Sequence, residues 1–86
     1  MRMQDQIEKA ISGVITIESI EIINESHRHA GHVGDNGTGE SHFRATIVSP
    51  DFEKMSRVQR QKIVMDAVKP LFSKGLHAFS LKANAP

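Results

Sequence analysis

Apolar residues near the start of the chain recur at the spacing of an amphipathic helix. Met3, Ile7, Ala10 and Ile11 fall at i, i+4, i+7 and i+8, so they share one face of a helix. Gly13 stands where a left-handed residue commonly ends such an element. The pattern therefore predicts a first helix that buries one side and stops at Gly13.

Two later stretches alternate between apolar and polar positions, as strands with one buried face do. The first runs to about Asn24 and the second covers residues 43–48. The segment between them has no helical pattern, and a parallel connection usually needs a crossover helix. We therefore expect the two strands to be antiparallel neighbours.

The second half of the chain predicts a helix and a third strand. Ser49-Pro-Asp breaks the preceding strand, and Ser56 and Gln59 then occupy the two positions of a capping box. Pro70 is expected to kink or end the helix, and Gly75 to stop it. The apolar residues assigned to the inner side of this helix are Val58, Val64, Val68, Leu71 and Phe72. Residues 77–83 alternate again and predict the last strand.

The predicted order is α-β-β-α-β, which is an α+β fold in a single domain over residues 1–86. Both helices are expected on one face of a three-stranded mixed sheet. The side chains expected to face the helices are Ile20, Ile22, Phe43, Ala45, Ile47, Phe79 and Leu81. Those expected to face water are Glu21, Arg44, Thr46, Ser80 and Lys82.

The segment between the first two strands carries four of the five histidines and four of the six glycines. Loops of this length inside a compact domain are usually functional or disordered. A segment rich in imidazoles suggests part of a metal or cluster site. The alternative is a polar connector whose histidines have no role, as compositional signals are weak.

Connectivity brings His77 towards the same segment. If the second and third strands share a sheet, they run parallel through a right-handed crossover, so both start at one end of the sheet. We therefore expect His77 to lie near His29, His32 and His42. His42 should point outward, because Phe43 faces inward, and should contribute to structure or to the rim of a site. His27 is expected to be exposed.

The composition excludes several classes of protein. The chain has 86 residues and no cysteine, so a disulfide framework is excluded. Its formal net charge of +1 argues against a protein that coats polyanions. No apolar run approaches the roughly 20 residues that span a bilayer, and the first residues do not resemble a signal peptide. We expect a cytoplasmic protein with no membrane role.

Basic residues gather at the start of the second helix, at the other end of the sheet. Lys54, Arg57, Arg60 and Lys62 could contact the phosphates of DNA, whose binding would then weaken with salt. Arg57 and Gln61 lie in line with buried positions, so they either extend past the sheet edge or contact a partner. With four Phe and no Trp or Tyr, the chain offers few aromatic rings for base stacking.

An enzyme is not expected. Ser26 and Ser41 lack the context of a nucleophile, and Glu25, Asp35 and Glu40 sit in glycine-rich chain that does not preorganise them.

Four segments together resemble the BolA family: NESHRHAGH (24–32), GESHFR (39–44), RVQRQK (57–62) and LHAFSLKA (76–83). The resemblance runs over nearly the whole chain. It implies a fold similar to a class II KH domain and work with monothiol glutaredoxins on [2Fe–2S] clusters. The family's cluster histidine at the head of the last strand falls on His77, and the loop ligand corresponds best to His29, with His32 a near rival.

The family resemblance also implies transcriptional control, DNA binding and a part in stress responses. The glycine-rich loop with which true KH domains grip phosphates is absent here, so nucleic-acid binding by that route is not expected.

Ligand counting limits what the chain can do with a cluster. Iron–sulfur clusters usually have four thiolate ligands, although Rieske-type centres use two imidazoles on one iron. Without cysteine, the chain is expected to bind no cluster alone. It is also expected to be a monomer in the absence of a partner. Two of its histidines with two thiolates from elsewhere would complete four ligands. The resemblance implies that these thiolates are a glutaredoxin cysteine and glutathione. Imidazole must be neutral to bind iron, so the shared cluster should lose stability as pH falls towards about 6.

Overall fold

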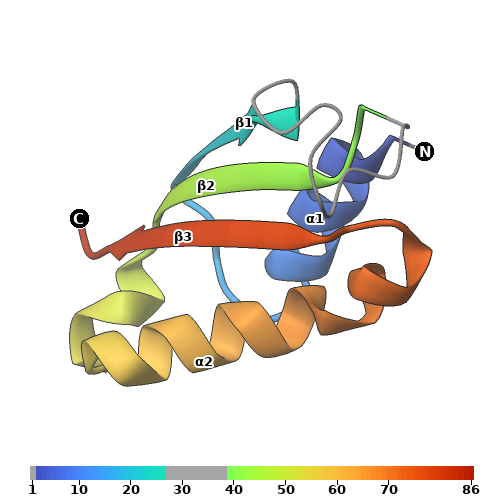
Figure 1. Cartoon of the computed structure of the whole chain (residues 1–86). Coiled ribbons are helices and arrows are strands. Elements are labelled where there is room, and N and C mark those ends of the chain that lie inside the picture. The colour runs from blue at the N-terminus through green and yellow to red at the C-terminus, as the bar shows by residue number, and fades with distance from the viewer. Residues whose placement is uncertain (1, 27–38) are drawn as a thin grey trace.

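Residues 2–26 and 39–86 are described by a computed structural model, in which helices lie on one face of a three-stranded sheet (Figure 1). The elements are α1 (Met3–Ser12), β1 (Ser19–Asn24), β2 (His42–Val48), α2 (Arg57–Val68) and β3 (Ala78–Asn84), with short 3₁₀ helices η2 (Pro50–Lys54) and η3 (Lys69–Lys74). The α+β fold and the α-β-β-α-β order predicted from the sequence are confirmed.

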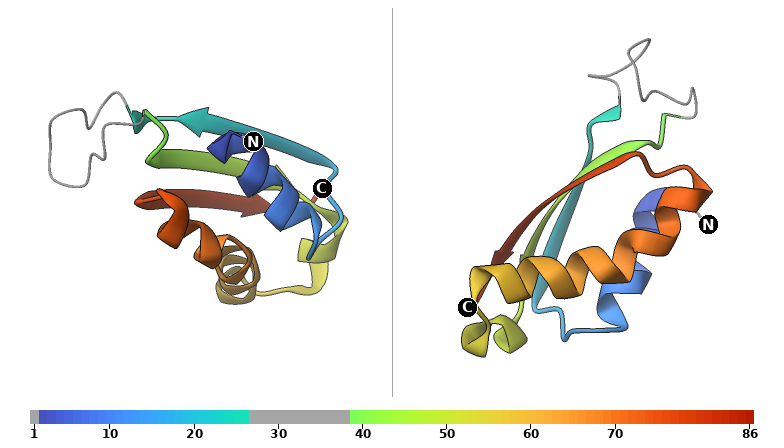
Figure 2. Two further views of the ribbon diagram at one scale, coloured as in Figure 1. Left: turned by 90° about the vertical axis from the view of Figure 1, so that its right-hand side faces the viewer. Right: turned by 60° about the horizontal axis from the view of Figure 1, so that its bottom comes forward.

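The strand order is β1-β2-β3, with β2 in the middle. β1 pairs antiparallel with β2, which places Ile22 opposite Ala45. β2 pairs parallel with β3, which places Phe43 opposite Phe79. Both predicted pairings are confirmed. Figure 2 shows α1 and α2 against the same side of this sheet.

The core lies between the sheet and the two helices. Phe43, Ala45 and Ile47 of the central strand are almost fully buried, and the other predicted inward residues are buried or packed against the core. Three further core residues were not predicted: Ile15, Phe52 and Leu76. They lie in connecting segments, where no periodic pattern marks a buried position.

The outward face of the sheet follows the predicted alternation with one exception. Glu21, Arg44, Ser80 and Lys82 are exposed, whereas Thr46 in the central strand is half-buried. A residue in the middle strand has neighbours on both sides, which reduces its contact with water even on the outer face.

The end of α1 differs from the prediction. Gly13 has φ −77° and ψ −14°, which is right-handed and not the left-handed conformation expected of a terminating glycine. The amides of Val14 and Ile15 both donate to the Ile11 carbonyl, at 3.0 and 3.2 Å. The chain thus leaves the helix through a tight right-handed turn, which brings Ile15 into the core.

The start of α2 is as predicted. The Ser56 hydroxyl accepts from the Gln59 amide at 3.1 Å, and the Gln59 side chain accepts from the Ser56 amide at 2.8 Å, which completes the capping box. The α-helix ends at Val68, before Pro70. Gly75 has φ 116° and ends η3, so the predicted stop is also confirmed.

Two residues assigned to the inner side of α2 are outside it. Val58 is 77 % exposed and Phe72 is 40 % exposed. Val58 lies about 120° around the helix from the buried Val64, at 100° per residue. Phe72 belongs to the 3₁₀ segment η3, where the period of 3.0 residues rotates it away from the core.

In the described part of the chain, no helix is both long enough and apolar enough to cross a membrane.

Candidate functional site

The first residues of β3 lie beside the base of the segment that is rich in histidine and glycine. The amides of His77 and Ala78 both donate to the Ser41 carbonyl, at 2.8 and 3.0 Å. His77 is therefore held at the end of the sheet where residues 39–41 enter β2. The connectivity argument from the sequence is confirmed at this point.

His77 and His42 are neighbours. Their ring centroids are 5.3 Å apart, with a tilt of 46° between the planes. The two rings differ in access to solvent, because His77 is exposed and His42 is only 6 % exposed. His77 can therefore meet a ligand or partner, with His42 behind it.

The prediction that His42 points away from the face of Phe43 and contributes to structure agrees with the structure, but its burial was not predicted. Strand alternation does direct its side chain away from the face that Phe43 occupies. The ring is nevertheless buried, because His77 lies against it and the Ser41 hydroxyl lies 2.7 Å from its Nδ1. That contact occupies one ring nitrogen and fixes the orientation of the imidazole.

Ser26 organises the base of the site. Its hydroxyl oxygen accepts from the amides of Ser41 and His42, at 2.9 and 3.0 Å, and its hydroxyl donates to the His42 carbonyl at 3.4 Å. Ser26 and Ser41 are both buried. The two serines that sequence analysis judged unsuitable as nucleophiles thus hold the backbone on either side of the histidine-rich segment.

Further contacts fix the two ends of this segment. The Asn24 side-chain amide donates to the Gly39 carbonyl at 2.7 Å, and Gly39 has φ 73°, a conformation that glycine adopts without strain. Glu25 forms an ion pair with Arg44 at 3.2 Å. The Glu40 carboxylate accepts from the Met3 amide at 3.1 Å, which ties the segment to the start of α1. The ends are therefore held by β1, β2 and α1 together.

The structure tests only part of the predicted ligand set. His77 lies where the sequence placed it, whereas His27, His29 and His32 lie outside the described residues. Among the described residues, His, Cys, Asp and Glu side chains form no group of three that could hold a metal ion. Sequence reasoning missed the burial of His42 and its contact with Ser41, although the register of β2 and β3 implies that residues 42 and 77 are close.

The basic residues at the other end of the sheet are not equivalent. Arg60 donates from Nε to the Met55 carbonyl at 3.1 Å and from Nη1 to the Ala83 carbonyl at 3.3 Å. Its guanidinium also lies 5.8 Å from the centre of the Phe52 ring. Arg60 thus joins α2 to the end of β3. Lys62 pairs with Asp66 at 2.9 Å, while Lys54 and Arg57 are exposed.

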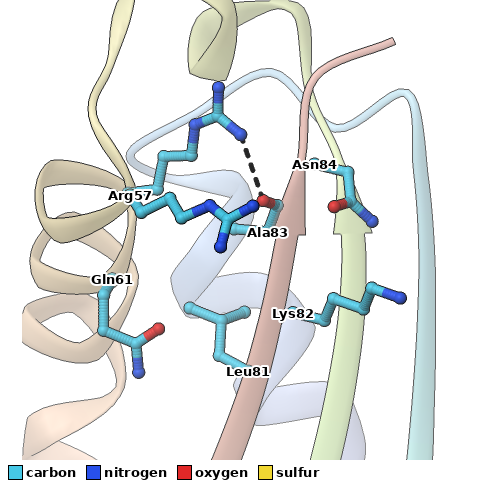
Figure 3. A pocket seen from close by; sticks show the side chains of 7 residues that line it. Arg57, Gln61, Leu81, Lys82, Ala83 and Asn84 are labelled. Atoms are coloured by element: carbon cyan, nitrogen blue, oxygen red, sulfur yellow. Dashed lines mark hydrogen bonds between the residues drawn. The ribbon is translucent and has the colours of Figure 1, made fainter.

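A cavity of about 300 Å³ lies between the start of α2 and the end of β3. Figure 3 shows Arg57 and Gln61 reaching from the helix towards the strand, where Leu81 faces them. The sequence left two possibilities for Arg57 and Gln61, which were extension past the sheet edge or contact with a partner. In the structure both side chains extend beside the sheet edge and line a cavity there. Contact with a partner stays a prediction.

Comparison with known proteins identifies the family. The family model described as BolA-like protein matches residues 11–86. An uncharacterised Sinorhizobium protein encoded in the cobS 5′ region is 46 % identical over 100 % of this chain and 94 % of its own. The Haemophilus influenzae protein named DNA-binding transcriptional regulator BolA is 33 % identical over 100 % of this chain and 80 % of its own.

A solved structure gives the same result for the fold. BolA1 from Arabidopsis thaliana superposes with a TM-score of 0.81 at 31 % identity, over 95 % of this chain and 89 % of that chain. The sequence match covers residues 11–86, which include His42 and His77. The chain therefore belongs to the BolA-like protein family.

Proposed function

We propose that this protein is an adaptor for iron–sulfur cluster assembly or trafficking, and that it supplies histidine ligands to a [2Fe–2S] cluster shared with a monothiol glutaredoxin. In this proposal His77 is one ligand and His29 or His32 is the second. A cysteine of the glutaredoxin and glutathione bound to it supply the two thiolates. The proposal includes no catalytic step by this chain.

The observation that carries the proposal is an exposed His77 imidazole at the base of the histidine-rich segment. Its position is fixed by the hydrogen bond from its amide to Ser41, and its inner side lies against the buried His42. A ligand held in this way needs little rearrangement before it binds iron, which favours a defined geometry. Surrounding groups of this kind orient the ligands of metal sites in general.

The donor set fits a shared cluster. The chain contains no cysteine, so any thiolate has to come from another molecule. Imidazole is an established ligand of [2Fe–2S] centres when thiolates complete the set. A heterodimer in which each side contributes two ligands satisfies this requirement.

Visible circular dichroism tests the proposal. Mixing the protein with cluster-loaded monothiol glutaredoxin should change the cluster's spectrum, because two thiolates are exchanged for imidazoles. With His77→Ala, the mixture should keep the spectrum that the cluster-loaded glutaredoxin has without a partner. Ser80→Ala, at an exposed residue of β3 close to His77 in sequence, should behave as the unaltered protein. A full spectral change with His77→Ala would reject His77 as a ligand.

A His77→Cys variant separates ligation from structure. A thiolate can replace the imidazole on iron, so the mixed cluster should form again with a lower reduction potential than with histidine. A side chain needed only for packing would not give this shift in potential. His29→Ala and His32→Ala, compared in the same assay, identify the loop ligand.

Acidification gives a further readout. Because imidazole binds iron only when neutral, the lifetime of the shared cluster should shorten between about pH 8 and about pH 6. A lifetime that stays constant across this interval would contradict histidine ligation.

The second candidate function is DNA binding by a transcriptional regulator, which the name of the Haemophilus relative supports. Arg57 is exposed at the start of α2, with Lys54 and Lys62 close by in sequence. Arg60 is a weaker candidate, because its guanidinium already binds two carbonyls. This function would use the end of the domain opposite to His77, so the two functions are compatible.

Salt dependence tests the second function. If Arg57 contacts a phosphate, Arg57→Ala should lower affinity for all DNA sequences and reduce the slope of log affinity against log salt by about one. Lys74→Ala, an exposed lysine in η3, serves as the control. Binding without a salt slope, or unaffected by Arg57→Ala, would argue against this interface.

A further inference from the structure

Strand β3 forms one edge of the sheet and pairs only with β2 among the described residues. The Ala78 amide donates to the Ser41 carbonyl, and the Asn84 carbonyl accepts from the Ser49 amide at 3.1 Å. In a parallel ladder alternate residues bond to the same neighbour, so the even-numbered residues of β3 face β2. The amides and carbonyls of Phe79, Leu81 and Ala83 therefore point to the open edge.

Part of this edge is already covered, and part is free. The Ala83 carbonyl accepts from Arg60 Nη1. For Phe79 and Leu81, the structure shows no partner for the outward amides and carbonyls within residues 2–26 and 39–86. Unpaired strand groups at the edge of a sheet are a template for another strand.

The cavity of about 300 Å³ lies along this edge. On one side Arg57 and Gln61 extend from α2, and Leu81 projects towards them (Figure 3). Lys82 and Asn84 are directed to the other side of the strand, away from α2 (Figure 3). A strand added here would thus have polar or charged groups on both faces and apolar contact with Leu81.

The charge at this edge is positive. Among the residues that the structure describes, no acidic one lines the cavity. In the described part of the chain, Arg57 and Lys82 form no salt bridge, in contrast to Arg2, Arg44 and Lys62. The site therefore offers two cations and two free backbone hydrogen-bonding positions to an incoming segment.

We propose that the β3 edge binds an extended segment of a partner protein that carries an acidic side chain. The segment adds a fourth strand by pairing with the backbone of Phe79 and Leu81, and its carboxylate lies against Arg57 or Lys82. Recognition of this kind takes affinity from main-chain hydrogen bonds and specificity from side chains. The inference does not depend on the proposed cluster site.

A second copy of this chain fits the edge less well. Two β3 edges paired across a two-fold axis would place Arg57 and Lys82 of both copies along one seam. The other sheet edge, β1, carries the exposed Glu21, but pairing β1 of one copy with β3 of the next is head-to-tail, which builds a ring or a filament of many copies. An acidic segment from another protein neutralises the cations without either consequence.

Nuclear magnetic resonance with a defined peptide tests the proposal. The probe is an acetylated and amidated pentapeptide of threonine and valine with a central glutamate. Its addition should shift the amide resonances of Phe79 and Leu81 and slow their exchange with solvent. The amides of Ser80 and Lys82 already face β2, so their exchange should stay unchanged and provides the internal control.

Charge and backbone pairing are tested separately. Replacing the central glutamate with glutamine, or both Arg57 and Lys82 with alanine, should weaken binding about tenfold, as expected for loss of a charge-assisted hydrogen bond. Lys69→Ala, at the far end of α2, should bind as the unaltered protein. A peptide N-methylated at the pairing positions should not bind.

Three results would overturn the proposal. The first is that the glutamate peptide leaves the Phe79 and Leu81 amides unchanged. The second is equal affinity for the glutamate and glutamine peptides. The third is self-association of the protein alone, measured by sedimentation, that is lost with Arg57→Glu and also lost with Glu21→Lys. In that case the occupant of the edge would be a second copy of this chain.

Discussion

The two ends of β3 are built in opposite ways. At its start, His77 lies against the buried His42, and Ser26 and Ser41 satisfy the surrounding polar groups through short hydrogen bonds. At its end, Arg57 and Lys82 are exposed cations beside a cavity. A buried hydrogen-bonded network fixes geometry, whereas exposed charges mainly steer and select partners. The comparison agrees with the two proposals, which place ligand binding by His77 at the first end and binding of a partner at the second.

The largest expected effect comes from the support beneath the cationic end. Phe52 is fully buried, and the Arg60 guanidinium lies over its ring. Phe52→Ala should lower the free energy of unfolding by about 3–5 kcal/mol, measured by urea denaturation. Phe72→Ala, at a half-exposed phenylalanine, should have a much smaller effect. Equal effects would show that the start of α2 is not packed as described.

Ser26→Ala should have the next largest effect and should act at the other end. It removes the acceptor shared by the Ser41 and His42 amides, so two buried hydrogen bonds are lost and stability falls by about 1–3 kcal/mol. Hydrogen exchange should quicken first at these two amides. Ser12→Ala removes an exposed hydroxyl bonded to the Lys9 carbonyl and serves as the control. Faster exchange spread evenly over the sheet would contradict a local role.

Arg60→Ala should lower stability by about 1 kcal/mol, because two partly buried hydrogen bonds are lost. Arg60→Lys should not restore both, since an ammonium lacks the fork geometry of a guanidinium. Arg57→Ala should leave thermal unfolding unchanged, as Arg57 is exposed. A loss with Arg57→Ala as large as with Arg60→Ala would remove the distinction between a structural and a binding arginine.

The smallest effect is expected for the Lys62–Asp66 pair. Both side chains are mostly exposed, so water and salt screen their attraction despite a distance of 2.9 Å. A double-mutant cycle with alanine at each position should give a coupling near zero at physiological salt. A strong coupling would mean that ion pairs, and not Phe52 and Arg60, hold the start of α2.

The sequence predicted the elements whose signals are local and periodic. Alternation located the faces of β2, and the Ser56–Gln59 capping box located the start of α2. The connectivity of a β-α-β unit was sufficient to place His77 beside His42. The family match and the shared fold support the predicted α-β-β-α-β order.

The sequence did not predict features that depend on distant contacts. Phe52 and Ile15 are buried because connecting segments fold back onto the sheet, and no period marks them. The conformation of Gly13 depends on how the chain returns to β1. The side chain of His42 follows strand alternation, but its burial results from contacts with His77 and Ser41. The contact with His77 exists only once β2 and β3 have paired. The ligand roles of His77, His29 and His32 all stay predictions.

The hydrogen bonds among Asn24, Ser26, Gly39 and Ser41 close the base of the histidine-rich segment independently of what lies between residues 26 and 39. Residues inserted or deleted there should leave the pairing of β1 with β2 in place, since lengthening a loop adds little closure entropy. Evolution could therefore vary the number and spacing of ligands in this segment without destabilising the domain that presents His77.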